Sequence, residues 1–288
     1  MRSEKNLNSV FIDQEKLLEF EAYLYERENA EATIRKYKSD AGAFLRYLGE
    51  ERRADKSRVM EYKEWLIENY AVSSVNSMLA SVNQFLTFLG YREMTVKPVK
   101  VQRNLFLKEE KELSRQEYKK LVKTARKEGK EQLALCMETI ASTGIRISEL
   151  QFFTVERVEK GRIEILNKGK YRRIFLTEEI RRKLLHFCKK SGLQQGQIFV
   201  TRTGKPKDRS NLWKEMKKLK EKAGICGSKI FPHNFRHLFA RVYYSCTKDL
   251  AGLADLLGHS SLNVTRIYTS NTGEVYQKQL EKMNVLRI

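Results

Sequence analysis

Apolar residues recur at helical spacing throughout residues 13–90, with no proline among them, and this feature most restricts the possible folds. The segment QEKLLEFEAYLYERE (14–28) places leucine and aromatic residues three and four positions apart, the period of one helical face. EATIRKYKSDAGAFLRYLGE repeats the pattern and stops at Gly49, while SRVMEYKEWLIENY and SVNSMLASVNQFLTFLGY continue it to Gly90. Strand-like alternation is absent, so we expect an all-α N-terminal domain of four helices.

The helical spacing of apolar residues is lost after residue 90. Pro98 and scattered charges predict a linker or strap over 91–112 rather than part of a core. Ser114 and Glu117 then form a capping-box pattern at a helix start, and EQLALCMETIAST forms a second helix that ends at Gly144. RIEIL and RRIFL alternate around NKGKY, which predicts a hairpin; a short strand, QIFVT, and further helices follow. We therefore expect a mainly α protein, with domains at 1–107 and 108–288 and a small β-sheet in the second, α+β domain.

Charge distinguishes the two predicted domains. The formal net charge is +20; residues 1–107 carry 17 Lys and Arg against 16 Asp and Glu, whereas residues 108–288 carry 39 against 20. This asymmetry predicts a polyanionic partner for the second domain, most simply nucleic acid. Charge that serves only solubility is the alternative. A membrane surface is disfavoured, because the basic residues do not lie opposite one apolar helical face.

The remaining composition favours a cytoplasmic protein. No apolar run of about 18 residues occurs, and the N-terminus lacks the apolar region of a signal peptide. The four cysteines are widely spaced, which favours free thiols in a reducing compartment over disulfides or a zinc site.

Two segments place cations at boundaries between predicted elements, where side chains can converge on a ligand. In TGIRISEL, Arg146 follows the glycine that ends a helix; a surface ion pair with Glu149 is the alternative interpretation. In NKGKYRR, Lys168 lies at the tip of the predicted hairpin and could reach a phosphate, although turns rich in lysine are common at surfaces. The cations that follow it are candidate nucleic-acid contacts: Lys170, Arg172 and Arg173.

Two further segments contain histidines. In PHNFRH, Pro232 begins a helix and puts His233 and Arg236 on one face, close to N–H groups that attract phosphate. His233 and His237 also have the spacing of metal ligands, but no neighbouring acid or thiol supplies a third. In LGHSSLNVTRIY, His259 follows a helix C-cap.

Tyr268 ends that last segment on the next predicted helix, and taken alone it would be interpreted as a core aromatic. Together, however, the two arginines, the lysine, the two histidines and the tyrosine suit attack on a phosphodiester. Guanidinium groups can clamp the non-bridging oxygens, while tyrosine and lysine can supply a nucleophile and an acid. No paired carboxylate cluster suggests a two-metal nuclease.

TGIRISEL, the hairpin lysine, HNFRH and LGHSSLNVTRIY resemble, in order and spacing, the signature segments of the tyrosine recombinases, the phage integrase family. The resemblance covers residues 113–270, and the helical first domain is similar to that family's core-binding domain. It implies a site-specific recombinase that cleaves and rejoins DNA through a covalent 3′-phosphotyrosyl intermediate. We do not expect the additional arm-binding domain of larger phage integrases, so the resemblance is to the two-domain Xer-type and mobile-element integrases.

The resemblance also implies roles for single residues. Arg146 resembles the first catalytic arginine, His233 and Arg236 the His-x-x-Arg pair, and His259 the second histidine. Tyr268 resembles the nucleophile.

Lys168 resembles the general acid that protonates the 5′-hydroxyl leaving group. NKGKY is shorter than the family's Gly-Lys-Gly-x-Lys pattern, so Lys170 or another cation could share this role. His237 has no catalytic counterpart, and we expect it to pack or to contact Glu149 or the backbone.

The partners implied by the resemblance are double-stranded DNA with inverted-repeat core sites and, on DNA, a homotetramer; the state off DNA stays open. The family's chemistry uses no cofactor, neither ATP nor metal, because the phosphotyrosyl link conserves the bond energy. The tail after Tyr268 resembles a segment that docks on a neighbouring subunit, and the expected location is the cytoplasm, on the nucleoid. In the near-neutral first domain we expect phosphate contacts from Arg35, Lys36 and Lys38.

Two alternatives stay open. A type IB topoisomerase-like or hairpin-resolving enzyme would share the pocket but would not exchange strands between paired sites. A sequence-specific DNA-binding protein of the same fold would keep the fold without cutting. The sequence does not give the target site, the cleavage spacing or the directionality factors, and it does not separate chromosome-dimer resolution from integration and excision of an element.

Overall fold

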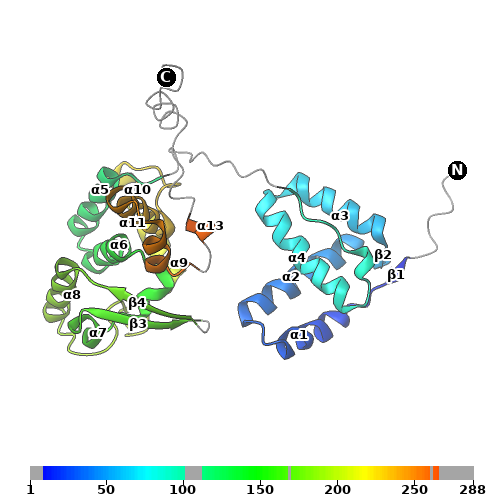
Figure 1. Cartoon of the computed structure of the whole chain (residues 1–288), viewed down its shortest axis with the longest axis horizontal. Coiled ribbons are helices and arrows are strands. Elements are labelled where there is room, and N and C mark those ends of the chain that lie inside the picture. Colours follow the sequence, from blue (N-terminus) through cyan, green and yellow to red (C-terminus); the bar gives the residue numbers. More distant parts are fainter. Residues whose placement is uncertain (1–8, 101–111, 168–169, 260–261, 266–288) are drawn as a thin grey trace, which may run out of the picture. The chain divides into compact units, whose positions relative to one another are not determined.

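The computed structural model describes residues 9–100, 112–167, 170–259 and 262–265, and the chain divides into two compact units, 1–103 and 104–288 (Figure 1). The mainly helical fold with a small sheet in the second unit confirms the predicted fold class. The predicted domain boundary, between residues 107 and 108, lies outside the described residues. No helix in the described ranges is long and apolar enough to cross a membrane.

The first unit is built from four helices, as the apolar periodicity predicts. They pack around an aromatic core in which Phe20, Phe44 and Phe85 are fully buried. The all-α prediction misses one small ladder, β1 (Val10–Phe11) paired with β2 (Arg53–Ala54), because two-residue strands are too short to show alternation. The helices are α1 (Lys16–Glu26), α2 (Glu31–Leu48), α3 (Lys56–Asn69) and α4 (Val72–Phe88).

A strap of residues 95–99 follows the short 3₁₀ helix η1 (Arg92–Met94) and runs along α4. Asn83 donates to the Val96 carbonyl at 2.8 Å and accepts from its N–H at 2.9 Å. Asn76 does the same for Val99, at 3.0 and 2.8 Å. Val96 is buried with Met94, so the prediction that residues from about 91 stay outside a core is wrong for this stretch.

The second unit is built around α6, most of whose residues are buried between α5, α8 and α11. The predicted capping box forms at Ser114 and Glu117, and the predicted hairpin forms with Asn167 opposite Lys170 across its tip. The prediction of a strand at QIFVT is wrong: this segment makes only isolated bridges, from Gln197 to Thr154 and from Val200 to Pro206. The unit's elements are α5 (Arg115–Lys127), α6 (Glu131–Thr143), η3 (Ile147–Phe152), α7 (Val155–Glu159), β3 (Arg162–Asn167), β4 (Lys170–Phe175), α8 (Glu178–Lys190), α9 (Arg209–Lys217), α10 (Lys220–Ala223), α11 (Pro232–Thr247), α12 (Leu250–Leu257) and α13 (Leu262–Thr265).

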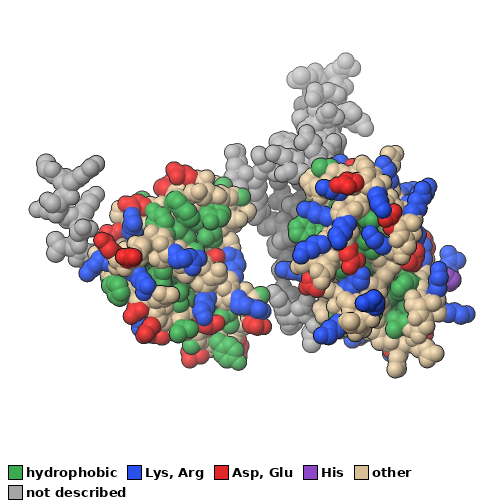
Figure 2. Space-filling view, turned by 180° about the vertical axis from the view of Figure 1, so that it is seen from behind, with side chains coloured by type: hydrophobic (Ala, Val, Ile, Leu, Met, Phe, Trp, Pro, Cys, Tyr) green, Lys and Arg blue, Asp and Glu red, His purple; other side chains and the backbone are tan. Residues whose placement is uncertain are grey.

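Surface charge follows the sequence asymmetry. On the face drawn in Figure 2, Lys and Arg side chains cover much of the second unit, whereas acidic and basic side chains alternate over the first.

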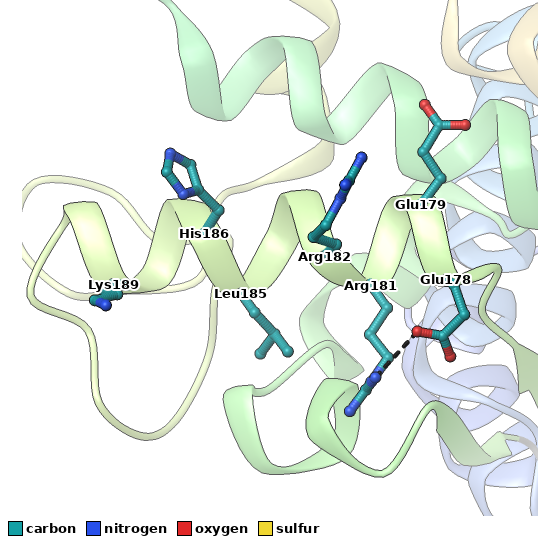
Figure 3. Close-up of a pocket in the computed structure, with 7 residues that line it drawn as sticks. All are labelled: Glu178, Glu179, Arg181, Arg182, Leu185, His186 and Lys189. Carbon is teal, nitrogen blue, oxygen red and sulfur yellow. Dashed lines mark hydrogen bonds and ion pairs between the residues drawn. The ribbon is translucent and has the colours of Figure 1, made fainter.

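One pocket lies along α8 and includes an ion pair of Arg181 with Glu178 at 3.1 Å (Figure 3). None of the residues that line this pocket is a predicted site residue. The lining consists of Glu178, Glu179, Arg181, Arg182, Leu185, His186 and Lys189.

Candidate active site

Arg236 is the centre of the candidate site. It lies in the first turns of α11 and is 1% exposed. Its Nη1 donates to the Gly144 carbonyl at 2.6 Å, and its Nη2 donates to the Leu257 carbonyl at 2.7 Å. Nη2 also lies 3.0 Å from His259 Nε2. These bonds fix the guanidinium plane between the C-terminal ends of α6 and α12.

His259 follows the left-handed Gly258 that ends α12, and its ring is held on both sides. An arginine has no acceptor, so Nε2 accepts from Arg236 and the ring proton lies on Nδ1. Nδ1 then donates to the buried Thr265 Oγ1 at 2.8 Å. Burial, followed by the charges of Arg236 and its neighbouring arginines, lowers the pKa of His259 to about 4. The imidazole is therefore neutral at physiological pH.

Arg146 precedes η3, and its side chain is 43% exposed, so it is open to a ligand. The buried Glu149 carboxylate holds it: the Arg146 N–H donates to Oε2 at 2.7 Å and Nη1 donates to Oε1 at 3.3 Å. The ion pair that the sequence offered as an alternative therefore forms, yet the guanidinium stays accessible. Pairing with Glu149 and exposure to a ligand coexist at this position.

His233 lies in the first turn of α11 beside His237, with their ring centroids 4.8 Å apart. Burial lowers the pKa of His233, and the charges of Arg236 and Arg146 lower it further. Burial, then His233 and nearby arginines, lowers the pKa of His237 to about 4. Within the described ranges, no group of three His, Cys, Asp or Glu side chains is placed to hold a metal ion.

One predicted DNA contact, Arg172, is buried in the structure. Arg172 lies on β4, opposite the buried Ile165, and its side chain is only 8% exposed. Its guanidinium donates to both Glu149 oxygens and to the Leu256 carbonyl. The Glu149 carboxylate neutralises this guanidinium, and the side chain is enclosed, so these contacts argue against Arg172 as a nucleic-acid contact.

The other predicted residues fall into three groups. Arg173 is at the surface of β4 and pairs with Glu164 at 3.1 Å, and the α2 cations pair with nearby acids: Arg35 with Glu31 at 3.2 Å, Lys36 with Asp40 at 2.5 Å and Lys38 with Glu21 at 2.5 Å. Lys168 and Tyr268 lie outside the described residues, as does the tail after Tyr268. Lys170 begins β4, but only its backbone is described.

The described part of the site can stabilise an anion. Two guanidiniums and two histidines converge where α6, α11 and α12 end or begin. The positive charges of Arg236 and Arg146 help to lower the pKa of His233 and the pKa of His259. Such a positive, partly buried cluster suits the non-bridging oxygens of a phosphodiester.

The chain belongs to the phage integrase family, the tyrosine recombinases, whose model matches residues 111–274. A second model, the phage integrase N-terminal SAM-like domain, matches residues 17–93. The first match spans more than half of the chain and includes every described residue of the site. The activity of this family is site-specific cleavage and rejoining of DNA.

Named relatives agree with this membership. The chain is 28% identical over 292 residues to the tyrosine recombinase XerA of Pyrococcus furiosus, covering 98% of this chain and 97% of that protein. It is 28% identical to the tyrosine recombinase XerD of Vibrio cholerae, covering 85% and 87%. Its fold is similar to a lambda integrase dimer bound to a COC′ core site, with a TM-score of 0.72, 18% identity and coverage of 91% and 77%.

Sequence reasoning missed three parts of the site. The sequence suggests Glu149 only as a surface partner, although it is buried and holds two arginines. The sequence analysis also does not predict the hydrogen bond between His259 and Thr265. Their spacing, six residues apart across a predicted helix start, could have suggested it. The role of the Gly144 carbonyl as an acceptor for Arg236 has no sequence signal, because the bonding atom is part of the main chain.

Proposed function

We propose that this protein cleaves DNA by attack of the Tyr268 hydroxyl on a phosphodiester, with Arg146, His233, Arg236 and His259 around the reacting phosphate. The observation that supports this most strongly is the convergence of Arg146, Arg236 and the two neutral histidines at one place. The attack forms a 3′-phosphotyrosyl bond and releases a 5′-hydroxyl. Attack by a second 5′-hydroxyl reverses the step and restores the phosphodiester.

Each described residue has a distinct part in this scheme. Arg146, exposed and fixed at its backbone by Glu149, contacts one non-bridging oxygen. Arg236, held rigidly by main-chain carbonyls, stabilises the same developing charge from the buried side. His233 donates or accepts a hydrogen bond at the phosphate without adding a permanent charge. His259, whose ring nitrogens bond Arg236 and Thr265, orients Arg236 at the same phosphate. Lys168 protonates the leaving oxygen, and Lys170 is the alternative for this role.

The proposed partner is double-stranded DNA with inverted-repeat core sites, bound by four copies of the chain, in the cytoplasm on the nucleoid. Two observations support this. A relative in fold, a lambda integrase, forms a tetramer on a Holliday junction, and the positive charge of this chain is concentrated in residues 108–288. Within the first domain, Arg35, Lys36 and Lys38 are proposed phosphate contacts, with Arg173 and Lys170 in the second.

The test uses a duplex that carries a candidate core site with a nick beside the scissile phosphate, so that the cleaved strand cannot be rejoined. Wild-type protein should form a complex that withstands SDS, and Tyr268→Phe should form none. Tyr25→Phe, which alters an exposed tyrosine of α1, is the matched control and should behave as wild type. A wild-type protein that binds its site but leaves no covalent complex would favour a DNA-binding role without cutting.

A second substrate separates the recombinase from a topoisomerase-like enzyme. Plasmids that carry two core sites should yield exchanged products, and plasmids that carry none should keep their supercoils. Relaxation of supercoiled DNA without core sites would support the topoisomerase-like alternative instead.

A further inference from the structure

We propose that Arg172 is a positioning residue, which fixes Arg146 and the segment Leu256–His259 relative to each other. This inference rests on the proposed function, because it concerns the same phosphate site. Arg172 does not itself contact the reacting atoms in this scheme; it acts through Glu149 and through the end of α12.

The first connection runs from Arg172 to Arg146. Arg172 Nη1 lies 3.1 Å from Glu149 Oε1 and 2.9 Å from Oε2. The same two oxygens accept from Arg146, at its side chain and at its backbone N–H. Glu149 is only 2% exposed. A buried carboxylate of this kind needs compensation, and Arg172 supplies the buried half while Arg146 remains accessible.

The second connection runs from Arg172 to His259. Arg172 Nη2 donates to the Leu256 carbonyl at 2.5 Å, at the C-terminal end of α12. The side chain also passes close to Gly258, where a Cβ would lie 2.8 Å from Arg172 Cδ. His259 is the next residue, and its ring bonds Arg236 and Thr265. Any shift of this turn would therefore move the ring that faces the phosphate site.

Only an arginine can make both connections at once. Its planar fork directs one terminal nitrogen to the carboxylate and the other to the carbonyl, whereas a lysine has a single nitrogen at the end of a flexible stem. The base of the side chain is anchored too, since Arg172 lies opposite the buried Ile165 in the β3–β4 ladder. The hairpin, the Arg146 turn and the end of α12 thus share one rigid junction.

The experiment compares Arg172→Lys with Arg172→Met, using Arg162→Lys and Arg162→Met as matched controls. Arg162 is an exposed arginine of β3, at the opposite end of the same hairpin, and has no proposed role in the site. Arg172→Lys keeps the positive charge but can hold only one of the two partners. We expect it to fold and to bind core-site DNA as wild type does, while the rate of covalent-complex formation falls about 10- to 100-fold. The Arg162 variants should keep the wild-type rate.

A second readout does not depend on cleavage. NMR spectra of the imidazole nitrogens report the hydrogen bonds of His259 directly. We expect these resonances to shift in Arg172→Lys, because the turn that carries His259 loses an anchor, and to stay in place in both Arg162 variants. Arg172→Met should in addition raise the pKa of His259, since it removes one of the charges that lower it.

Two results would overturn the inference. One is a wild-type cleavage rate in Arg172→Lys together with unchanged His259 resonances. The other is a loss of DNA affinity in Arg172→Lys that accounts for the whole loss of rate, which would make Arg172 a DNA contact. If wild type forms no covalent complex at all, the proposed function fails, and the His259 resonances still decide whether Arg172 positions this turn.

Discussion

Gly144 shows how one residue supports the site through its backbone alone. It ends α6 with φ +64°, and a Cβ there would lie 2.4 Å from the Phe239 ring and 2.9 Å from Leu257. Gly144→Ala should therefore lower the free energy of unfolding by about 2–5 kcal/mol, from left-handed strain and overpacking together. Chemical denaturation measures this directly. Gly129→Ala, at φ +69° with open space around it, is the control and should cost only the conformational part, about 1–2 kcal/mol.

Two partly buried histidines, His237 and His259, make stability depend on pH. The pKa values of His237 and His259 in the folded protein are about 4, below the ordinary value of 6.5. The unfolded chain therefore binds protons first as the pH falls, so these groups contribute full stability above pH 6.5 and lose it toward pH 4. The Tm should fall over this range, and His237→Gln should reduce the fall. The exposed His186→Gln should follow the wild-type curve; a His237→Gln curve identical to wild type would contradict the assignment.

At the scale of elements, the strap on α4 depends on two amide side chains. Asn83 pairs with both the N–H and the carbonyl of Val96, as a neighbouring strand would. Asn83→Ala leaves these backbone groups without their partner in a partly buried place, which should cost about 1–3 kcal/mol of unfolding free energy. Asn69→Ala is the control, because its amide only donates to the Trp65 carbonyl on the exposed side of α3. Equal stabilities for the two variants would mean that the strap contributes little.

The same scale shows what the sequence can predict. Periodicity and capping chemistry are local, so the four N-terminal helices, the Ser114 cap and the β3–β4 hairpin follow from short segments. The sequence predicts a linker or strap but not its attachment to α4, because the partners on α4 lie 13 and 23 residues away and asparagine has no single preferred environment. The prediction for QIFVT is wrong because β-propensity does not reveal whether a neighbouring strand exists.

For the site, the sequence could supply the residue types but not their pairings. Arg146, His233, Arg236 and His259 follow from chemistry and order along the chain. The burial of Arg172 does not, because a cation next to a hairpin tip looks the same in sequence whether it points outward or into the molecule. Arg172 points into the molecule because the fold brings it to Glu149, which lies 23 residues earlier in the sequence. A contact over this separation leaves no local pattern in the sequence.

At the scale of the whole molecule, the charge asymmetry predicts DNA binding that weakens steeply with salt. The cations on α2 provide a test of whether the near-neutral first domain takes part. Charge reversal at Arg35, Lys36 and Lys38 should weaken binding and make the slope of log K against log salt shallower by about 0.9 for each phosphate that the protein no longer neutralises. Titrations of core-site DNA at several salt concentrations measure the slope. An unchanged affinity and slope would remove these three residues from the interface.

The two buried arginines differ in what holds them. Arg236 donates to the main-chain carbonyls of Gly144 and Leu257, whereas Arg172 depends on the side chain of Glu149 as well as on the Leu256 carbonyl. A carbonyl survives most substitutions of the residue that carries it, but a carboxylate disappears with its side chain. Over evolutionary time, positions 149 and 172 should therefore change together in descendant lineages, while position 236 should stay fixed as its carbonyl-bearing neighbour at 257 drifts among similar apolar residues.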